Sequence, residues 1–477
     1  MGLDGLAPEG TLANAASADV PQAPKNSETG AQKWAEASPD RQPSTDWIAS
    51  FDDPMLDALV AEAMKVNTDI RMAAARLQQA EASAKSSRAG LYPSIGTSAG
   101  ASRSDGLSGN VPGASSFNLG GTISWEVDMW GRVRNQADAG DLDAQASSAD
   151  YAGTRLAIAG FTTQTWFNLI EARLQKDLAI RNVQTQERAL RLTKRRFDGG
   201  ISGSSDFRLA RSALANAQAN LATRKRIQAS TTRLLETVLR RYPEDALSTR
   251  ETLPNLPPLT NAGTPQDIFL RRPDLLAAER RMHAAGLRVD ISKKNLLPRL
   301  TLSGDTTTRA SSLTRLFSLN NLVASVAGGL TAPIFQGGAL RADVARNKAV
   351  LRLQMEAYAD TALTAYREVE DALDAEGLLS EREAALTISL EEAQKAEDRL
   401  EQRFSEGLAS ILQLLDSQGR RISTEGQLIS ARKERLANRV RLHLALGGGL
   451  YGQETARQVL AKPKLNLPGI SGFSSSP

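Results

Sequence analysis

The chain is built from two copies of one pattern, and this duplication restricts its fold more than any other feature. Residues 67–93 align with residues 272–298, so that Asp69 matches Asp274 and Pro93 matches Pro298. Further along, RFDGGISGSSD (196–206) aligns with RFSEGLASILQ (403–413), and the offset between the copies changes only from 205 to 207. A shared alanine-rich composition does not explain matching proline, glycine and Arg-Phe positions. We therefore expect both copies to fold into the same order of elements.

Each copy predicts a helix that ends at the matched proline, then two extended segments, then two long helices. The first repeat is expected over 46–245, with strands at about 94–104 and 116–128 and a helical hairpin at about 134–241. The second is expected over 265–450, with strands at about 299–309 and 322–334 and a hairpin at about 339–446. Residues 246–264 would link the repeats, and 1–45 and 451–477 would be irregular tails.

The hairpin helices carry a strict seven-residue repeat, which is typical of left-handed coiled coils. In the second copy the repeated positions are Val344, Leu351, Tyr358, Ala365, Ala372, Leu379, Leu386, Ala393 and Leu400, followed by Leu408, Leu415, Ile422, Ile429, Leu436 and His443. A helix of about 65 residues would be roughly 100 Å long. We expect an antiparallel coiled-coil hairpin whose tip is the break at residues 403–407.

The extended segments alternate between apolar and small polar residues. In 117–127, one face carries Phe117, Leu119, Ile123 and Trp125, and the other carries Asn118, Thr122 and Glu126. Strands of this length with one apolar face fit a membrane β-barrel, but a soluble β-sandwich shows the same alternation. Alternation alone leaves both folds open.

Composition excludes several classes of function. The 477 residues contain no cysteine and only His283 and His443, which removes disulfides, thiolate chemistry and histidine-rich metal sites. Lys and Arg number 58 against 54 Asp and Glu, without a basic cluster of the kind that nucleic-acid binding requires. Glu279 and His283 lie four apart without a third ligand, so a surface pair is favoured over a metal site. No catalytic constellation is present, and we predict neither an enzyme nor a cofactor.

With these elements in place, the chain resembles the TolC/OprM-like outer-membrane factors, the exit ducts of tripartite efflux pumps. The resemblance covers about 46–450 and depends on the duplicated order, the paired proline helix ends, the two Arg-Phe-x-x-Gly tips and Arg271-Arg272-Pro273-Asp274. It implies a mainly α fold with a membrane β-barrel. A homotrimer would form a 12-stranded barrel in the outer membrane of a Gram-negative bacterium, continued by a coiled-coil α-helical periplasmic tunnel.

The resemblance also implies passive export of drugs or other small toxic compounds. The partners would be outer-membrane lipid, a periplasmic adaptor (membrane fusion) protein and an inner-membrane pump of the resistance-nodulation-division type. Because most members of this subgroup carry a lipidated cysteine after a signal, we expect the native precursor to be lipid-anchored, although this sequence has neither. Two alternative functions remain open: an exit duct for protein secretion and a soluble coiled-coil scaffold.

Aligned with the family, the second tip places Asp416 at the position of a constricting aspartate in the periplasmic gate. Leu412 would form a hydrophobic constriction one turn before it. Gln413 stands where some members have a second aspartate, and Phe404 and Ala409 replace a tyrosine and an arginine that lock the tip. Asp206 matches the partner of those residues, and we expect Arg403 to supply its cation. The tips that would contact the adaptor are Gly200, Ile201, Ser202 and Gly203, and Gly407, Leu408, Ala409 and Ser410.

Overall fold

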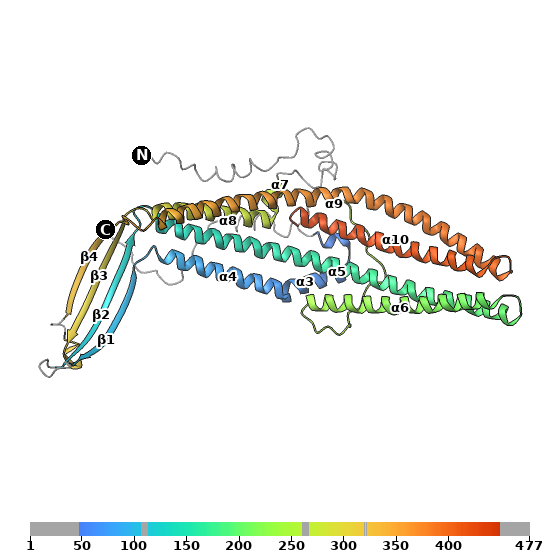
Figure 1. Ribbon diagram of the computed structural model, residues 1–477, viewed down its shortest axis with the longest axis horizontal. Coiled ribbons are helices and arrows are strands. Elements are labelled where there is room, and N and C mark those ends of the chain that lie inside the picture. The colour runs from blue at the N-terminus through green and yellow to red at the C-terminus, as the bar shows by residue number, and fades with distance from the viewer. Residues whose placement is uncertain (1–46, 106–112, 260–266, 319, 321, 449–477) are drawn as a thin grey trace, which may run out of the picture. The chain divides into compact units, whose positions relative to one another are not determined.

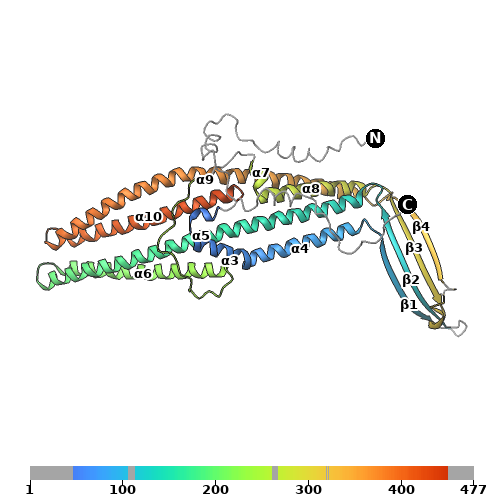
Figure 2. The same ribbon diagram turned by 180° about the vertical axis from the view of Figure 1, so that it is seen from behind.

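The computed structural model describes residues 47–105, 113–259, 267–318, 320 and 322–448 (Figures 1 and 2). The expected tails at 1–45 and 451–477 lie outside these residues. The chain divides into two compact units. The first contains residues 74–150 and 274–362, and the second contains residues 151–273 and 363–448 together with the described residues up to Ala73.

Four antiparallel strands form one sheet in the first unit, in the order β1-β2-β3-β4. Their bounds are β1 Ser94–Ser104, β2 Ala114–Val127, β3 Arg299–Ala310 and β4 Leu322–Thr331. β2 and β3 pair along Phe117–Val127, and this pairing joins the two copies of the sequence pattern. The strands lie close to the predicted ranges. β4 ends at Thr331, three residues before the predicted 334 and two residues before Pro333, which has no backbone N–H for a ladder bond.

The strand-to-helix turn of the first copy is fixed by a short run of side chains. Asp128 accepts hydrogen bonds from the backbone N–H groups of Val133 and Arg134 at 2.9 and 2.8 Å, which caps helix α5 (Arg132–Asp198). Gly131 supplies the turn with a φ of +69°. Gly337, its match in the second copy, has a φ of +58° and precedes α9 (Ala339–Ser405). Both copies therefore use glycine where the backbone is left-handed.

The same unit holds most of α4 (Thr68–Ala89) and α8 (Pro273–Lys294), together with the first residues of α5 and α9. Ion pairs connect these helices. Arg88 of α4 pairs with Asp141 of α5 at 2.5 Å, and Arg288 of α8 pairs with Asp143. These ion pairs link α4 and α8 to α5 at partly exposed positions.

The second unit is a pair of helical hairpins. Helix α5 is followed by α6 (Ser204–Val238), and α9 is followed by α10 (Ile411–Ala445); each pair lies side by side (Figures 1 and 2). The heptad positions of α9 are all buried or half-buried, as a coiled-coil seam requires. Helix α6 ends three residues before the predicted 241, because Arg240 takes a left-handed φ of 54°.

The main core of this unit packs a short N-terminal segment against the hairpins. Asp53 caps α3 (Pro54–Val66) and also accepts a hydrogen bond from the indole of Trp166 at 2.9 Å. The fully buried aromatic and aliphatic side chains around it are Trp47, Phe51, Leu56, Trp166, Phe167, Leu169, Ile170 and Leu235. Their burial supplies the main apolar stabilisation of this end of the hairpins.

One residue of the RRPD segment, Arg272, has a packing role in the second hairpin. Arg272 is buried at the junction of α7 (Asp267–Arg271) and α8, and it donates hydrogen bonds to Glu368 at 2.6 Å and to the carbonyl oxygen of Ala445 at 3.1 Å. It therefore ties the C-terminal end of α10 to α9. The positive guanidinium is suited to the carbonyls exposed at a helix C-terminus.

Candidate functional site

The tips of the two hairpins are the candidate site, and they are built alike. Gly200 and Gly407 take φ values of +72° and +84° just after α5 and α9. Ile201 N–H donates to the carbonyl of Arg196, and Leu408 N–H donates to the carbonyl of Arg403, both at 2.8 Å. These are the bonds of a glycine-terminated helix. Ser410 then caps α10 through a reciprocal pair of hydrogen bonds with Gln413.

The predicted adaptor-contacting residues are largely exposed at these turns. Ile201 and Leu408 are 72% and 65% exposed, which is high for large aliphatic side chains. A Cβ added at Gly200 would meet nothing within 4 Å, so the turn is open to close approach by another chain. Ser202 is half-buried and Ala409 is buried in the tip core. Each tip therefore presents one apolar side chain above a small, tightly turned backbone.

The two residues predicted to form the constriction lie in the first turns of α10 and face solvent in the single chain. Leu412 is 64% exposed. The carboxylate of Asp416 pairs with Arg420 at 2.9 Å across one helical turn, with both side chains well exposed. An exposed pair of this kind contributes little to stability. Asp416 is thus available to meet other groups.

No ion pair joins Asp206 and Arg403 in the described part of the chain. Arg403 donates to the carbonyl of Leu408 in its own turn at 3.4 Å. Asp206 lies in the first turn of α6, and none of the described residues forms an ion pair with it. The expected pair is therefore not formed within the described residues of this chain.

The link between the tips is instead made by Arg196, which the sequence did not single out. Its Nη1 donates to the carbonyl oxygen of Phe404 at 2.8 Å, and its guanidinium carbon lies 4.8 Å from the centre of the Phe404 ring. Phe404 is almost fully buried in a small core. The other members of that core are Ala210, Ala409, Ile411 and Leu414, with Leu190, Leu192, Leu400 and Leu415 packed against it. The first hairpin thus holds the second by a cation and an apolar cluster.

Behind the tip, a buried ion pair joins α9 to α10. Arg421 pairs with Glu397 and also with Glu425 at 2.7 Å. Burial raises the pKa of Glu397 above its ordinary value, although Arg421 acts in the opposite direction. The pair fixes the register of the second hairpin close to Asp416.

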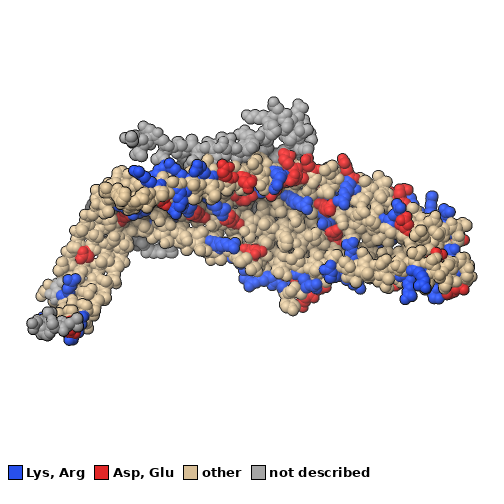
Figure 3. Space-filling model, in the orientation of Figure 1, with Lys and Arg blue, Asp and Glu red and all other residues tan. Residues whose placement is uncertain are grey.

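Charge is unevenly distributed along the chain. Figure 3 shows Lys, Arg, Asp and Glu side chains over the helices, whereas the sheet is mostly uncharged. Val326, Leu330 and Val323 of β4 are 89%, 67% and 64% exposed in the single chain. No helix in the described part of the chain combines the length and the apolarity needed to cross a membrane. Nor do the described residues contain a cluster of three or more potential metal ligands.

Comparisons with known proteins agree with this architecture. The sequence profile of the outer membrane efflux protein family matches residues 59–239 and 264–448. The pyoverdine export outer membrane protein OpmQ of Pseudomonas aeruginosa is 30% identical over 429 residues, which cover 87% of this chain and 89% of OpmQ. The solved outer-membrane channel OprN superposes with a TM-score of 0.80 at 26% identity, covering 91% of this chain and 99% of OprN. The open state of the MtrE outer membrane channel of Neisseria gonorrhoeae has a TM-score of 0.75 at 29% identity, covering 83% and 90%.

The chain belongs to the outer membrane efflux protein family. It is therefore an outer-membrane component of an efflux system.

Proposed function

We propose that three copies of this chain assemble into a closed duct, with a 12-stranded β-barrel continued by a helical tunnel. The open sheet supports this assembly. Within the described residues, β1 pairs only with β2 and β4 only with β3, so each outer strand has one unpaired edge. Unpaired backbone N–H and C=O groups are not tolerated in lipid. Pairing β4 of one copy with β1 of the next removes every edge. Leu322, Val326 and Leu330, which share one face of β4, would then face lipid.

Strand length and the two hairpins support the same proposal. The strands have 10 to 14 residues, which is enough to cross a bilayer at the tilt found in barrels. Each chain contributes two hairpins, and a threefold axis would surround the tunnel with twelve helical segments. The matched glycine turns after β2 and after β4, at Gly131 and Gly337, are consistent with a duplicated unit.

The tunnel is gated at the hairpin tips. Three copies of Asp416 would form an acidic ring, and three copies of Leu412, one turn closer to the tip, would form an apolar ring. The exposure of both side chains in the single chain supports this arrangement. Asp206, which has no ion-pair partner within the described protomer, would find its cation on the neighbouring copy.

The exposed tips bind a periplasmic adaptor, which connects the duct to an inner-membrane pump of the resistance-nodulation-division type. The open glycine turns, flanked by Ile201 and Leu408, are suited to an apolar contact with a second helical hairpin. The cargo would be small molecules, because relatives are named for the export of pyoverdine, toluene and cations.

Planar-bilayer conductance of the purified protein tests the duct and its gate together. We expect the wild type to show rare openings selective for cations, and Asp416→Ala to lower that selectivity and raise the open fraction several-fold. Asp398→Ala removes an exposed carboxylate from α9 and is the matched control. Absence of conductance in the wild type and in every variant would contradict the proposal that the protein forms a duct. Equal conductance and selectivity in wild type and Asp416→Ala would contradict only the proposed role of Asp416 in the gate.

A further inference from the structure

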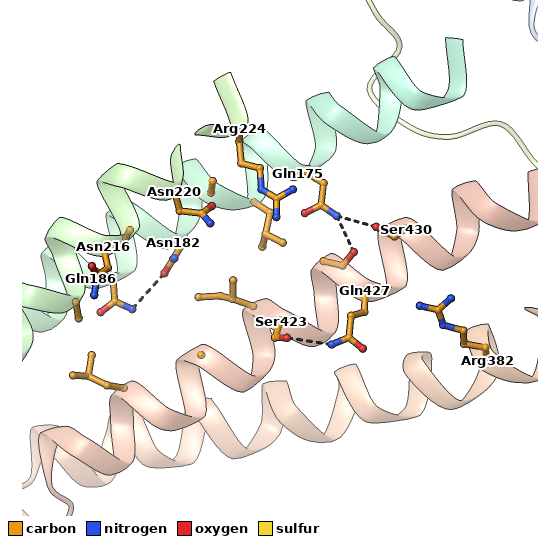
Figure 4. Close-up of a pocket in the computed structure, with 18 residues that line it drawn as sticks. Gln175, Asn182, Gln186, Asn216, Asn220, Arg224, Arg382, Ser423, Gln427 and Ser430 are labelled. Carbon is orange, nitrogen blue, oxygen red and sulfur yellow. Dashed lines mark hydrogen bonds between the residues drawn. The ribbon is translucent and has the colours of Figure 1, made fainter. Parts of the chain in front are cut away.

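A cavity of about 700 Å³ lies between α10 and the hairpin of α5 and α6 (Figure 4). Its polar lining consists of neutral amides and hydroxyls. These are Gln175, Asn182 and Gln186 from α5, Asn216 and Asn220 from α6, and Ser423, Gln427 and Ser430 from α10. None of the described residues that line it is an Asp or a Glu. The described lining therefore carries no negatively charged side chain.

Two arginines line the cavity, and they differ in their partners. Arg382 pairs with Glu434 at 2.7 Å. Arg224 forms no ion pair or hydrogen bond with any residue in the described ranges, and Figure 4 shows its guanidinium pointing into the space beside Gln175. It continues the row of Asn216 and Asn220 on α6, since residues four apart share one helix face. The cavity thus contains one uncompensated positive charge.

Gln186, whose side chain is buried, carries a second polar group without a partner among the described residues. Both hydrogens of its amide nitrogen are donated, to Asn182 Oδ1 at 3.3 Å and to Gln418 Oε1 at 3.1 Å. Its own Oε1 is buried and accepts no hydrogen bond within the described part of the chain. Buried acceptors in native proteins are nearly always satisfied. Gln186 is one of the residues that line the cavity, so a hydrogen-bond donor on a bound molecule would satisfy this oxygen after a small movement of the side chain.

Gly419 marks open space on the α10 side of the cavity. A Cβ built on this residue would meet no atom within 4 Å. The neighbouring apolar lining comes from Leu178, Leu415 and Ile422, which can contact the carbon skeleton of a bound molecule. A volume of about 700 Å³ is in the range of small-molecule sites.

We propose that this cavity binds a small organic anion that carries several hydroxyl groups. Its carboxylate would pair with Arg224, whose planar guanidinium can hold both oxygens. One hydroxyl would donate to Gln186 Oε1, and the remaining hydroxyls would exchange hydrogen bonds with the asparagine and serine side chains. The site is complete within one protomer and does not depend on the assembly or gating proposed above.

Isothermal titration of the purified full-length protein with gluconate and sorbitol tests this site. The two probes have the same six-carbon polyhydroxyl skeleton, but only gluconate is charged. We expect saturable gluconate binding and at least tenfold weaker sorbitol binding. Absence of gluconate binding overturns the proposal. Equal binding of sorbitol overturns the role of Arg224.

Two pairs of variants connect the binding to the cavity. Arg224→Gln should weaken gluconate binding at least tenfold, whereas Arg226→Gln, which removes an exposed charge from the same helix outside the cavity, should change it less than twofold. Gly419→Leu should fill the space and abolish binding, whereas Gly377→Leu, at an exposed glycine of α9 with equal room, should preserve it. Unchanged helical circular dichroism checks the fold of each variant. Binding that survives both Arg224→Gln and Gly419→Leu places the anion elsewhere and overturns the proposal.

Discussion

Arg196 and Phe404 connect the two hairpin tips by two contacts at once. The arginine donates to the phenylalanine carbonyl at 2.8 Å, and its guanidinium lies over the phenylalanine ring. The same carbonyl accepts the N–H of Gly407 at 3.1 Å, so the arginine is coupled to the turn that ends α9. One side chain of the first hairpin therefore stabilises the turn of the second.

Replacing Arg196 with alanine should loosen that turn without unfolding the protein. A charge-assisted hydrogen bond and a cation–π contact together stabilise the closed turn by about 2 kcal/mol. Hydrogen exchange at the amides of Gly407 and Leu408 should then accelerate about thirtyfold, because each 1.4 kcal/mol is a factor of ten. Arg195→Ala removes the preceding, exposed arginine and should leave both rates unchanged. Equal rates in the two variants would show that the apolar core alone holds the tip.

The buried position of Arg272 predicts a clear loss of stability on substitution. Arg272→Ala leaves the carbonyl of Ala445 and the carboxylate of Glu368 without this donor. The expected cost is about 1–3 kcal/mol, seen as a lower thermal unfolding midpoint. Arg271→Ala changes the adjacent, less buried arginine of the same segment and is the control. A larger loss of stability for Arg271→Ala than for Arg272→Ala would contradict this prediction, because Arg271 would then be the more important residue of the segment.

Gly304 of β3 faces Ile123 of β2 across the sheet, and the pair predicts a rescue experiment. A Cβ on Gly304 would lie 2.9 Å from Cγ2 of Ile123, which no side chain tolerates without movement. Gly304→Ala should therefore lower the yield of assembled protein in detergent, and Ile123→Ala should restore it in the double variant. Gly329→Ala, where a Cβ meets nothing within 4 Å, should assemble normally. A double variant as poor as Gly304→Ala would mean that the steric contact is not the cause.

For most of the strands and long helices, the ends predicted from the sequence lie within three residues of the ends in the structure. Local rules fix those ends: glycine at positive φ after the strands and a heptad seam along the hairpins. The side-chain partner of each tip arginine was not predictable in this way. Arg196 and Arg403 occupy equivalent positions in the two Arg-Phe-x-x-Gly segments, yet Arg196 reaches the other hairpin and Arg403 bonds within its own turn. Only the packing of the two hairpins distinguishes them. The duplicated motif itself was the signal that both arginines required attention.

His443 predicts a dependence of stability on pH. Its ring stacks on Trp47 with 5.4 Å between ring centres, and burial, aided by Arg439, lowers its pKa from 6.5 to about 4. As the pH falls through 6.5, the unfolded chain binds a proton that the folded chain does not, so this contribution to stability is present above pH 6.5 and is lost on the way to pH 4. The loss amounts to about 3 kcal/mol at pH 4 and below. His443→Phe keeps an aromatic ring against Trp47 but cannot titrate. The difference in unfolding free energy between wild type and this variant should therefore shift against the wild type by about 2 kcal/mol between pH 7 and pH 4.5. The carboxylates titrate in both proteins, so their contributions cancel in the comparison. Parallel curves of stability against pH would therefore show that His443 is not the group responsible.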